Sequence, residues 1–190
     1  MTTGRLGTLE RVTAALRDRE PLILEPEGSQ AAVALMLRER EGLEIFVIKR
    51  ADREGDPWSG HMALPGGRRE PADATPYDTA RRETLEEVGV DLAEGKLLGR
   101  LDDMGPRSAG RHFVVSTVVV ALDAEPGPVD PNEVAEAFWV PIEKLAEEDV
   151  EIADFPGSWP AFTYKERYVI WGLTHRILAQ LWALIGRDNP

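Results

Sequence analysis

Three glutamates crowd the segment RRETLEEVG, residues 81–89, and their spacing could place metal-binding chemistry on one helix. Glu83, Glu86 and Glu87 are three and four residues apart, so on a helix their carboxylates lie close enough to share a ligand. They also crowd the predicted helix C-terminus, where the partial negative charge of the backbone repels carboxylates. A divalent cation would remove this repulsion, and Mg²⁺ or Mn²⁺ prefers such hard oxygen ligands. The pattern therefore favours a metal site over a solvated charged face.

The helix that carries these glutamates has well-marked ends. Thr75 is suited to the N-cap, with Pro76 at the first helical position and Asp78 three residues after the cap. Gly89 is suited to the left-handed C-terminal cap. The helix is therefore expected to span about 13 residues, or roughly 20 Å. The glutamates are predicted to lie on a different face from the core-facing residues, which are Tyr77, Ala80, Thr84, Leu85 and Val88.

The full segment GGRREPADATPYDTARRETLEEVGV, residues 66–90, resembles the Nudix box. Gly67 matches the first glycine of that pattern. Two positions depart from it: Thr84 stands at an aliphatic position, and Asp73 replaces a glutamate with eight rather than seven residues before the arginine. The residues that match the second half are Arg82, Glu83, Glu86, Glu87, Gly89 and Val90. The chain is similar to the Nudix hydrolase family.

The extra residue is similar to the spacing in coenzyme A diphosphatase-like Nudix proteins, and the C-terminal YVIWGLTHRIL resembles the Trp-Gly helix of that group. The upstream signature of the group is matched at its Pro-Gly-Gly but differs before it. Trp58 stands at the histidine position, His61 at the glutamine position and Leu64 at the phenylalanine position. The resemblance is therefore closest to this group while leaving the substrate open.

The resemblance implies an α/β fold, a Nudix-type α/β/α sandwich around a mixed β-sheet. It implies hydrolysis of a nucleoside diphosphate linked to another group, with Mg²⁺ or Mn²⁺ held by Glu83, Glu86 and Glu87. A carbonyl of the Gly-Gly loop, at Gly67, would complete the metal ligands. Arg82 would orient the glutamates, and its spacing of four from Glu86 indicates this independently.

Catalysis needs an acid that accepts a proton from water once the cations neutralise the diphosphate. Within the box, Glu83 or Glu86 could do this while the others bind metal. Outside it, Glu133 is a possible base or extra ligand, and Glu136 is a further candidate near the same predicted strand. We rank Glu83 and Glu86 above Glu133, and the predicted catalytic set is completed by Arg82.

Substrate contacts are predicted from the arginines and from one histidine. Arg50 ends a predicted strand, Arg68 and Arg69 follow the Gly-Gly loop, and each could contact a phosphate in a planar two-point fashion. His61 lies in the loop that leads to the metal site. The competing interpretation is that these are surface arginines and that His61 makes a structural hydrogen bond.

Aromatic residues in irregular segments offer a second kind of contact. Trp58, Trp159 and Phe162 could stack on a base, although such residues more often pack under loops. Trp139 and Trp171 are expected in the core.

The elements that must position these residues alternate along the chain, which indicates an α/β or α+β class with a mixed sheet. Turn-rich ADREGDPWSGHMALPGG separates the second strand from the acidic helix. Helices are predicted at Leu9–Arg19, at 76–88, from Pro141 onward and at Lys165–Ile185, with ADFPGSWPAF irregular between the last two. Strands are predicted at Ala31–Arg38, Leu43–Arg50, 97–104, His112–Leu122 and Ala137–Val140.

Length and charge limit the class of protein. A chain of 190 residues fits one domain over 1–190, with a core at about 30–150 and a helix at each end. The net charge of -12 repels nucleic-acid phosphates, so a nucleic-acid partner is not expected. The small nucleotide-derived substrate is what the resemblance implies. The C-terminal apolar run is broken by His175, Arg176 and Gln180, so no membrane association is expected.

The absence of cysteine excludes disulfides and thiolate metal sites. With no signal peptide evident at the N-terminus, a cytoplasmic location is expected. A homodimer is a possible assembly, since many Nudix proteins are dimers.

Three functions remain open from the sequence. The leading hypothesis is a diphosphatase acting on coenzyme A or an acyl-CoA, with ADP-ribose, a nucleotide sugar or a nucleoside triphosphate as alternative substrates. The second is a non-catalytic binding module with the same fold. The third, a plain structural domain, leaves the carboxylates at the helix end unexplained.

Overall fold

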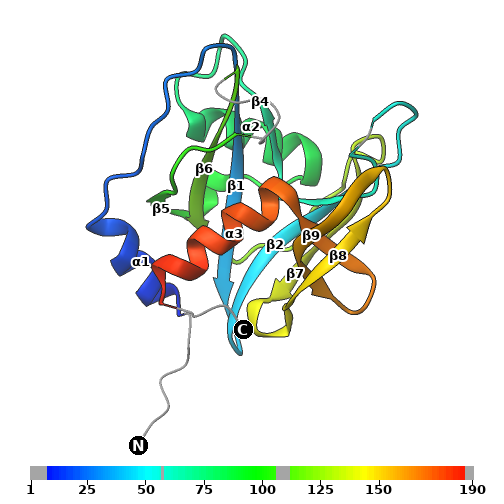
Figure 1. The fold of residues 1–190 in the computed structure, drawn as a ribbon. Helices are drawn as coiled ribbons and strands as arrows, with labels where there is room; N and C mark the ends of the chain where they lie inside the picture. Colours follow the sequence, from blue (N-terminus) through cyan, green and yellow to red (C-terminus); the bar gives the residue numbers. More distant parts are fainter. Residues whose placement is uncertain (1–7, 57, 106–111, 187–190) are drawn as a thin grey trace, which may run out of the picture.

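The computed structural model describes residues 8–56, 58–105 and 112–186. Within this part of the chain, strands and helices interleave (Figure 1). The helices are α1 (Leu9–Arg17), α2 (Pro76–Val88) and α3 (Gly172–Leu184), with 3₁₀ turns η1 (Leu92–Glu94) and η3 (Ile142–Lys144). The strands are β1 (Ser29–Glu39), β2 (Leu43–Arg50), β3 (Met62–Ala63), β4 (Gly66–Arg68), β5 (Lys96–Arg100), β6 (Phe113–Ala121), β7 (Val134–Pro141), β8 (Ala146–Ile152), β9 (Phe155–Tyr164) and β10 (Tyr168–Trp171).

The larger sheet has seven strands and is mixed. Its main order is β3-β2-β1-β6-β5, with β4 paired to β1 and β7 paired to β2. The β1–β6 pair is parallel, with Ser29 opposite Phe113 and Leu37 opposite Ala121, and the other pairs in this sheet are antiparallel. The smaller sheet is antiparallel, in the order β10-β9-β8. The mixed sheet predicted from the sequence is confirmed.

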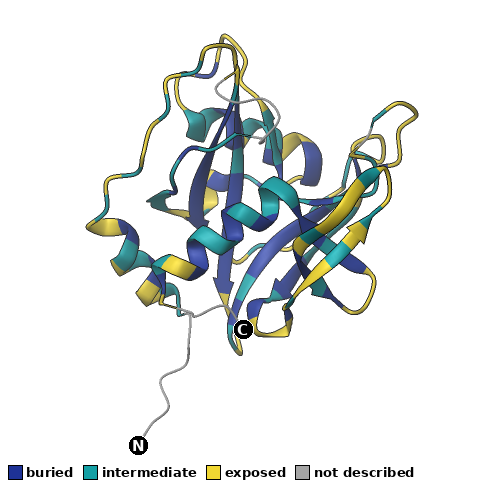
Figure 2. Ribbon diagram, viewed as in Figure 1, coloured by how far each residue is buried: buried dark blue, intermediate teal, exposed yellow. Residues whose placement is uncertain are grey.

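Helices cover both faces of the larger sheet, because successive side chains of a strand point to opposite faces. On one face, Ala34 and Met36 of β1 pack with Ala80 and Val88 of α2. The opposite face belongs to a cluster with α1, α3 and the smaller sheet. Figure 1 shows α3 in front of the sheet and α2 behind it, and Figure 2 shows the central strands buried between these layers. The predicted α/β/α sandwich is confirmed.

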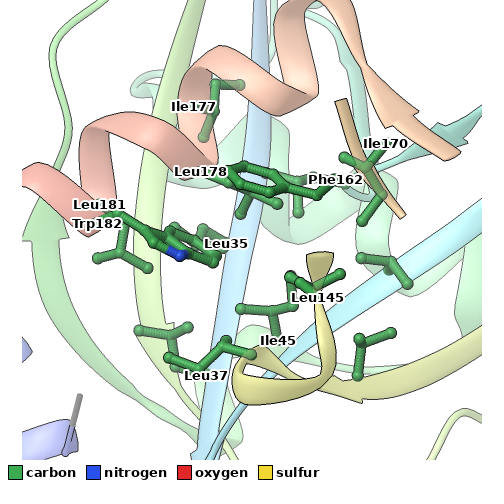
Figure 3. Packing of buried hydrophobic residues seen from close by; sticks show 14 of the residues in the cluster. Leu35, Leu37, Ile45, Leu145, Phe162, Ile170, Ile177, Leu178, Leu181 and Trp182 are labelled. Carbon is green, nitrogen blue, oxygen red and sulfur yellow. The ribbon is translucent and has the colours of Figure 1, made fainter. Parts of the chain in front are cut away.

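The α3 side of the core is the more aromatic of the two. Leu35 of β1, Phe162 of β9 and Trp182 of α3 are each fully buried there (Figure 3). The rings of Phe162 and Trp182 stack with centroids 5.2 Å apart. Burial of each such side chain stabilises the fold by about 1.5–3 kcal/mol, so this cluster fixes the smaller sheet and α3 onto the larger one.

Three of the expected elements agree with the structure, whereas the stretch 51–67, expected to be a loop, also contains β3 and the start of β4. The strand expected at Leu43–Arg50 is β2 with the same bounds, and the helix expected at Leu9–Arg19 is α1, which ends two residues earlier. The strand expected at His112–Leu122 is β6. Strong patterns of branched residues and clear turns explain this agreement.

The expected structure is wrong between Ile142 and Trp171. The helix predicted after Pro141 is only the 3₁₀ turn η3, and it is followed by β8. The stretch predicted as irregular lies largely within β9. The final helix, expected over Lys165–Ile185, begins only at Gly172.

The amino-acid composition of β8 and of β9 is unusual for a strand, so the sequence did not predict either one. β8 reads AEEDVEI, rich in residues that are depleted in strands, and β9 contains Pro156 and Pro160, which argue against a strand interior. The β9–β10 connection places Lys165 and Glu166 at φ 51° and 57°. Tight hairpins of this kind usually carry Asn-Gly, so the sequence gives no turn signal here.

None of the helices in the described ranges is long and apolar enough to cross a membrane.

Candidate active site

Helix α2 has the ends that the sequence predicts. The hydroxyl of Thr75 accepts a hydrogen bond from the backbone N–H of Asp78, whose carboxylate in turn accepts one from the backbone N–H of Thr75. Pro76 starts the helix, and Gly89 closes it at φ 66° with its N–H bonded to the carbonyl of Leu85. Such caps contribute about 1 kcal/mol each and fix which residues form the last turn.

The last turn is rotated differently from the sequence prediction. Leu85, expected in the core, is 48% exposed, whereas Glu87 is only 5% exposed. A glutamate therefore takes a core-facing position beside Val88. The carboxylate of Glu87 accepts a hydrogen bond of 2.9 Å from the backbone N–H of Gly66. Burial raises the pKa of Glu87 to about 8, with the nearby charges of Glu83 and Glu133 adding to the shift.

Two glycines bring the backbone of β4 against α2. Gly66 has φ 147°, and a Cβ there would lie 2.3 Å from the carbonyl oxygen of Ala32. A Cβ on Gly67 would lie 2.4 Å from the carboxyl carbon of Glu83. Only glycine leaves this space, so the Gly-Gly pair lets the Glu83 carboxylate rest against the strand backbone. Gly67, Glu83 and Glu87 are thus brought together, as predicted.

The remaining two carboxylates of the box have different environments. The side chain of Glu83 is 16% exposed, and burial raises its pKa while its bond to Arg82 acts in the opposite sense. The side chain of Glu86 is 58% exposed and points toward water one turn along the same helix. Within the described ranges, no three His, Asp or Glu side chains already stand in the arrangement of a formed metal site.

The donor set nevertheless fits a hard divalent cation. The carboxylates of Glu83 and Glu87 lie against the backbone of the Gly-Gly strand, and their negative charges repel one another. Such oxygen ligands suit Mg²⁺ or Mn²⁺, and a bound cation would offset the cost of ionising Glu87 in a buried position.

The guanidinium of Arg82 donates five hydrogen bonds and links the acidic residues of the site. It donates to both carboxylate oxygens of Asp73, at 3.3 and 3.0 Å, and to the carbonyl of Arg68 at 3.0 Å. The same group donates to Glu83 at 2.8 Å and to Glu86 at 3.2 Å. The predicted orienting contacts of Arg82 with both glutamates are present.

Asp73 is a site residue that the sequence analysis left without a role. It is 5% exposed, and it accepts a hydrogen bond from the backbone N–H of Glu70 as well as those of Arg82. The hydrogen bond from Arg82 is the main reason that its pKa falls to about 2. The acid at the unusual spacing of the Nudix box was the available signal, because its carboxylate anchors Arg82.

The paired Asp73 predicts a specific dependence of stability on acid. Its pKa is lower in the folded state than the ordinary value of 3.8, so its stabilisation is complete above pH 4 and is lost as the pH falls toward 2. Asp73→Asn is expected to unfold more easily than wild type at pH 6 and to show a shallower loss of stability between pH 4 and 2. Urea unfolding at several pH values measures both. If wild type and Asp73→Asn lost stability equally steeply between pH 4 and 2, the lowered pKa would not belong to Asp73.

The two acids outside the box differ in how firmly they are held. Glu133 is exposed, and its carboxylate pairs with Arg53 at 3.2 Å. Glu136 accepts a hydrogen bond from the hydroxyl of Tyr168 at 2.6 Å and pairs with Arg167 at 2.8 Å, and its pKa is lowered, mainly by the Tyr168 bond. Glu133 is the better placed of the two as an extra base, because its charge already acts on the carboxylates of Glu83 and Glu87.

The predicted substrate-binding arginines have unequal freedom. Arg69 donates to Gln30 and to the carbonyls of Asp73 and Ala74, so its guanidinium is used within the loop. Arg50 pairs with Asp56 at 2.6 Å, yet its charge also reaches Glu87, whose pKa it lowers against the dominant effect of burial. Arg68 is exposed, with its guanidinium 5.9 Å from the ring centre of Phe113.

His61 lies among aromatic rings rather than among the carboxylates. Its ring centre is 5.3 Å from that of Trp171 and 5.9 Å from that of Trp58. Burial lowers its pKa from the ordinary value. Trp139 and Trp171 are buried as expected, whereas Phe162, expected in an irregular segment, is in the core of β9.

The fold and the site together define an α/β sandwich protein with a capped acidic helix laid over a Gly-Gly strand. A family model described as NUDIX domain matches residues 28–158. The chain therefore belongs to the Nudix family, whose hydrolases generally need divalent metal ions.

The matches to known proteins span different shares of those proteins, from 32% to 71% of their length. An uncharacterized protein of Schizosaccharomyces pombe, C14C4.10c, is 40% identical over 107 residues, which are 53% of this chain and 32% of that protein. The peroxisomal coenzyme A diphosphatase NUDT7 of Mus musculus is 30% identical over 83% of this chain and 70% of its own length. A MutT/nudix family protein from Enterococcus faecalis has a similar structure, with TM-score 0.57 and 17% identity over 97% of this chain and 71% of its own.

Proposed function

We propose that this protein hydrolyses the diphosphate linkage of a nucleoside diphosphate derivative with the help of a divalent cation, Mg²⁺ or Mn²⁺. The observation that carries the proposal is the convergence of Glu83 and Glu87 on the backbone of Gly66 and Gly67. Glu86 lies on the same last turns of α2 and shares Arg82 with Glu83. A structural domain has no need of a buried glutamate whose pKa is raised to about 8.

The side chains divide the work of the reaction. When bound, the cation neutralises the diphosphate and lowers the pKa of a water molecule. Arg82 holds Glu83 and Glu86 in place through its fixed fork of donors. Glu83, whose pKa is already raised, accepts the proton of the attacking water, with Glu86 as the alternative acceptor. Of the predicted substrate-binding arginines, Arg68 is the most available to phosphate oxygens, because Arg69 is bonded within its loop and Arg50 pairs with Asp56.

Coenzyme A or an acyl-CoA is the substrate that we favour. The similarity to the mouse coenzyme A diphosphatase covers most of both chains. The longer spacing that seats Asp73 against Arg82 and the Trp-Gly pair that opens α3 agree with that group. ADP-ribose, a nucleotide sugar or a nucleoside triphosphate is the alternative, and the departures at Trp58, His61 and Leu64 favour it.

Identification of reaction products tests the proposal. The protein is incubated with Mg²⁺ or Mn²⁺ and a panel of coenzyme A, ADP-ribose, nucleotide sugars, nucleoside triphosphates and dinucleoside polyphosphates. Cleavage of coenzyme A to 3′,5′-ADP and 4′-phosphopantetheine is the expected result. Cleavage of a different compound of the panel would make that compound the substrate instead of coenzyme A. Tight binding of one compound without any turnover would instead support a non-catalytic module.

Cation binding should also be visible as thermal stabilisation. At concentrations far above its dissociation constant, Mg²⁺ or Mn²⁺ is expected to stabilise the fold by about 2–3 kcal/mol, which raises Tm by roughly 5–10 °C. Glu87→Gln is expected to lose most of this gain, whereas Glu94→Gln, an exposed glutamate outside the site, keeps it. Differential scanning fluorimetry with and without EDTA makes the comparison. Equal gains in both variants would remove Glu87 from the cation site.

A further inference from the structure

A concave region lies where the smaller sheet meets the edge of the larger one. The cavity has a volume of about 180 Å³ and is walled by both sheets and by the loop before β3. Its lining includes Lys49, His61, Met62, Ile152, Tyr168 and Trp171. Pockets for whole small molecules usually measure about 300–1,000 Å³, so this one has room for a single ring system.

Aromatic rings gather beside this cavity: His61 and Trp171 line it, and Trp58, which is not one of its lining residues, packs against both. Trp58 contacts His61, Phe155 and Trp171, with ring centres 5.9, 5.2 and 6.0 Å away. Trp171 is 7% exposed, but Trp58 remains 45% exposed although its ring is held by three others. A large ring that is fixed in place and still accessible is suited to stacking on a planar ligand.

Polar groups also converge on the cavity. The Nδ1 atom of His61 is buried and has no hydrogen-bond partner among the described residues. Across the cavity, the hydroxyl of Tyr168 and the cations of Lys49 and Arg167 surround the carboxylate of Glu136, at 2.6, 3.7 and 2.8 Å. A ligand ring with hydrogen-bonding groups on its edge would satisfy this nitrogen once the His61 ring turns to expose it, whereas a purely apolar ring would not.

The cavity is connected to the carboxylate site by a short, ordered stretch of chain. The carbonyl of His61 accepts a hydrogen bond of 3.0 Å from the backbone N–H of Arg50, whose charge acts on Glu87. His61 and Gly67 are six residues apart, which limits their separation to roughly 20 Å. The cavity therefore lies within roughly 20 Å of the carboxylate site.

We propose that the cavity and Trp58 bind the heterocyclic base of the nucleoside diphosphate derivative, with the base stacked on Trp58 and its edge hydrogen-bonded to Nδ1 of His61. The inference rests on the proposed function, which places the diphosphate at Glu83 and Glu87. Selectivity among bases then comes from His61, and affinity from the tryptophan ring.

Equilibrium dialysis with Mg²⁺ tests the pocket without relying on turnover. The probes are ADP and UDP, which carry a purine and a pyrimidine, and inorganic pyrophosphate, which has no base. Wild type is expected to bind at least one nucleotide more tightly than pyrophosphate. Trp58→Ala is expected to weaken that nucleotide about tenfold or more, as stacking of one base is worth roughly 1–3 kcal/mol, and to leave pyrophosphate unchanged.

Two further variants complete the comparison. Trp58→Phe keeps a smaller ring and is expected to lose less affinity than Trp58→Ala. Leu97→Ala removes a side chain that is 50% exposed on β5, at the opposite edge of the sheet, and is expected to change nothing. If wild type bound nucleotide and pyrophosphate equally tightly, or if Trp58→Ala weakened both equally, the proposal that this pocket binds the base would be wrong.

Failure of the pocket and failure of the proposed function give different results. Turnover of a panel substrate with kcat and KM unchanged in Trp58→Ala would refute the base pocket and leave the hydrolase standing. Base-dependent binding without turnover of any panel member would refute the hydrolase and leave the base pocket standing.

Discussion

Glu86→Gln is expected to lower kcat at least about a hundredfold and to leave the fold intact. The side chain of Glu86 is 58% exposed, and its hydrogen bond in the structure is the one from Arg82 at 3.2 Å. Glutamine keeps the size of the side chain and can still accept that bond, so the stability of the protein changes little. What it loses is the negative charge that a cation or a proton requires. Steady-state rates and a thermal melt of the same preparation measure both effects.

A glutamate of similar exposure provides the control for this experiment. Glu10 lies in the first turn of α1, and Glu10→Gln is expected to leave kcat unchanged. If Glu86→Gln retained full turnover, Glu86 would have no part in catalysis, and Glu83 and Glu87 alone would have to supply the charge.

Arg82→Met is expected to destabilise the protein by about 2–4 kcal/mol, and to abolish most turnover as well. The change removes both hydrogen bonds to Asp73, leaving a carboxylate that is 5% exposed without its main partner. A charge left buried in this way is among the more costly results of a single substitution. Glu83 and Glu86 lose their common donor at the same time. Urea unfolding and kcat together report the two losses.

The neighbouring arginine supplies a matched comparison. Arg81 makes a two-point pair with Asp91 at 2.6 and 2.9 Å, but its side chain is 45% exposed. Exposed pairs of this kind contribute about 0–1 kcal/mol, so Arg81→Met is expected to have a small effect on stability and none on kcat. Similar losses in the two variants would show that Arg82 acts only as another surface ion pair.

The sequence predicted the elements whose signals are local. Thr75, Pro76, Asp78 and Gly89 define α2 because caps depend on only a few neighbouring residues. The smaller sheet escaped prediction because its turn uses Lys165 at positive φ, where sequence patterns lead one to expect glycine or asparagine. Its stability comes from packing against the rest of the fold, which no short window contains.

The candidate site was predictable to the level of the motif and no further. The box identified Arg82 and the glutamates, but helical periodicity assigned Leu85 to the core in place of Glu87. Hydrophobicity alone cannot anticipate that a buried position holds an acid bonded to Gly66. Likewise, the arginines near the Gly-Gly loop look equivalent in sequence, and only the three hydrogen bonds of Arg69 show that it is already occupied.

The parallel pairing of β1 with β6 has a consequence for how this molecule acquires its site. β1 lies between β4, which carries Gly66 and Gly67, and β6, which follows much later in the chain. During synthesis the acidic helix emerges well before β6, so its glutamates have no completed sheet to pack against. Closing such a distant contact is slow, so the sheet that supports α2 is completed only after β6 has emerged.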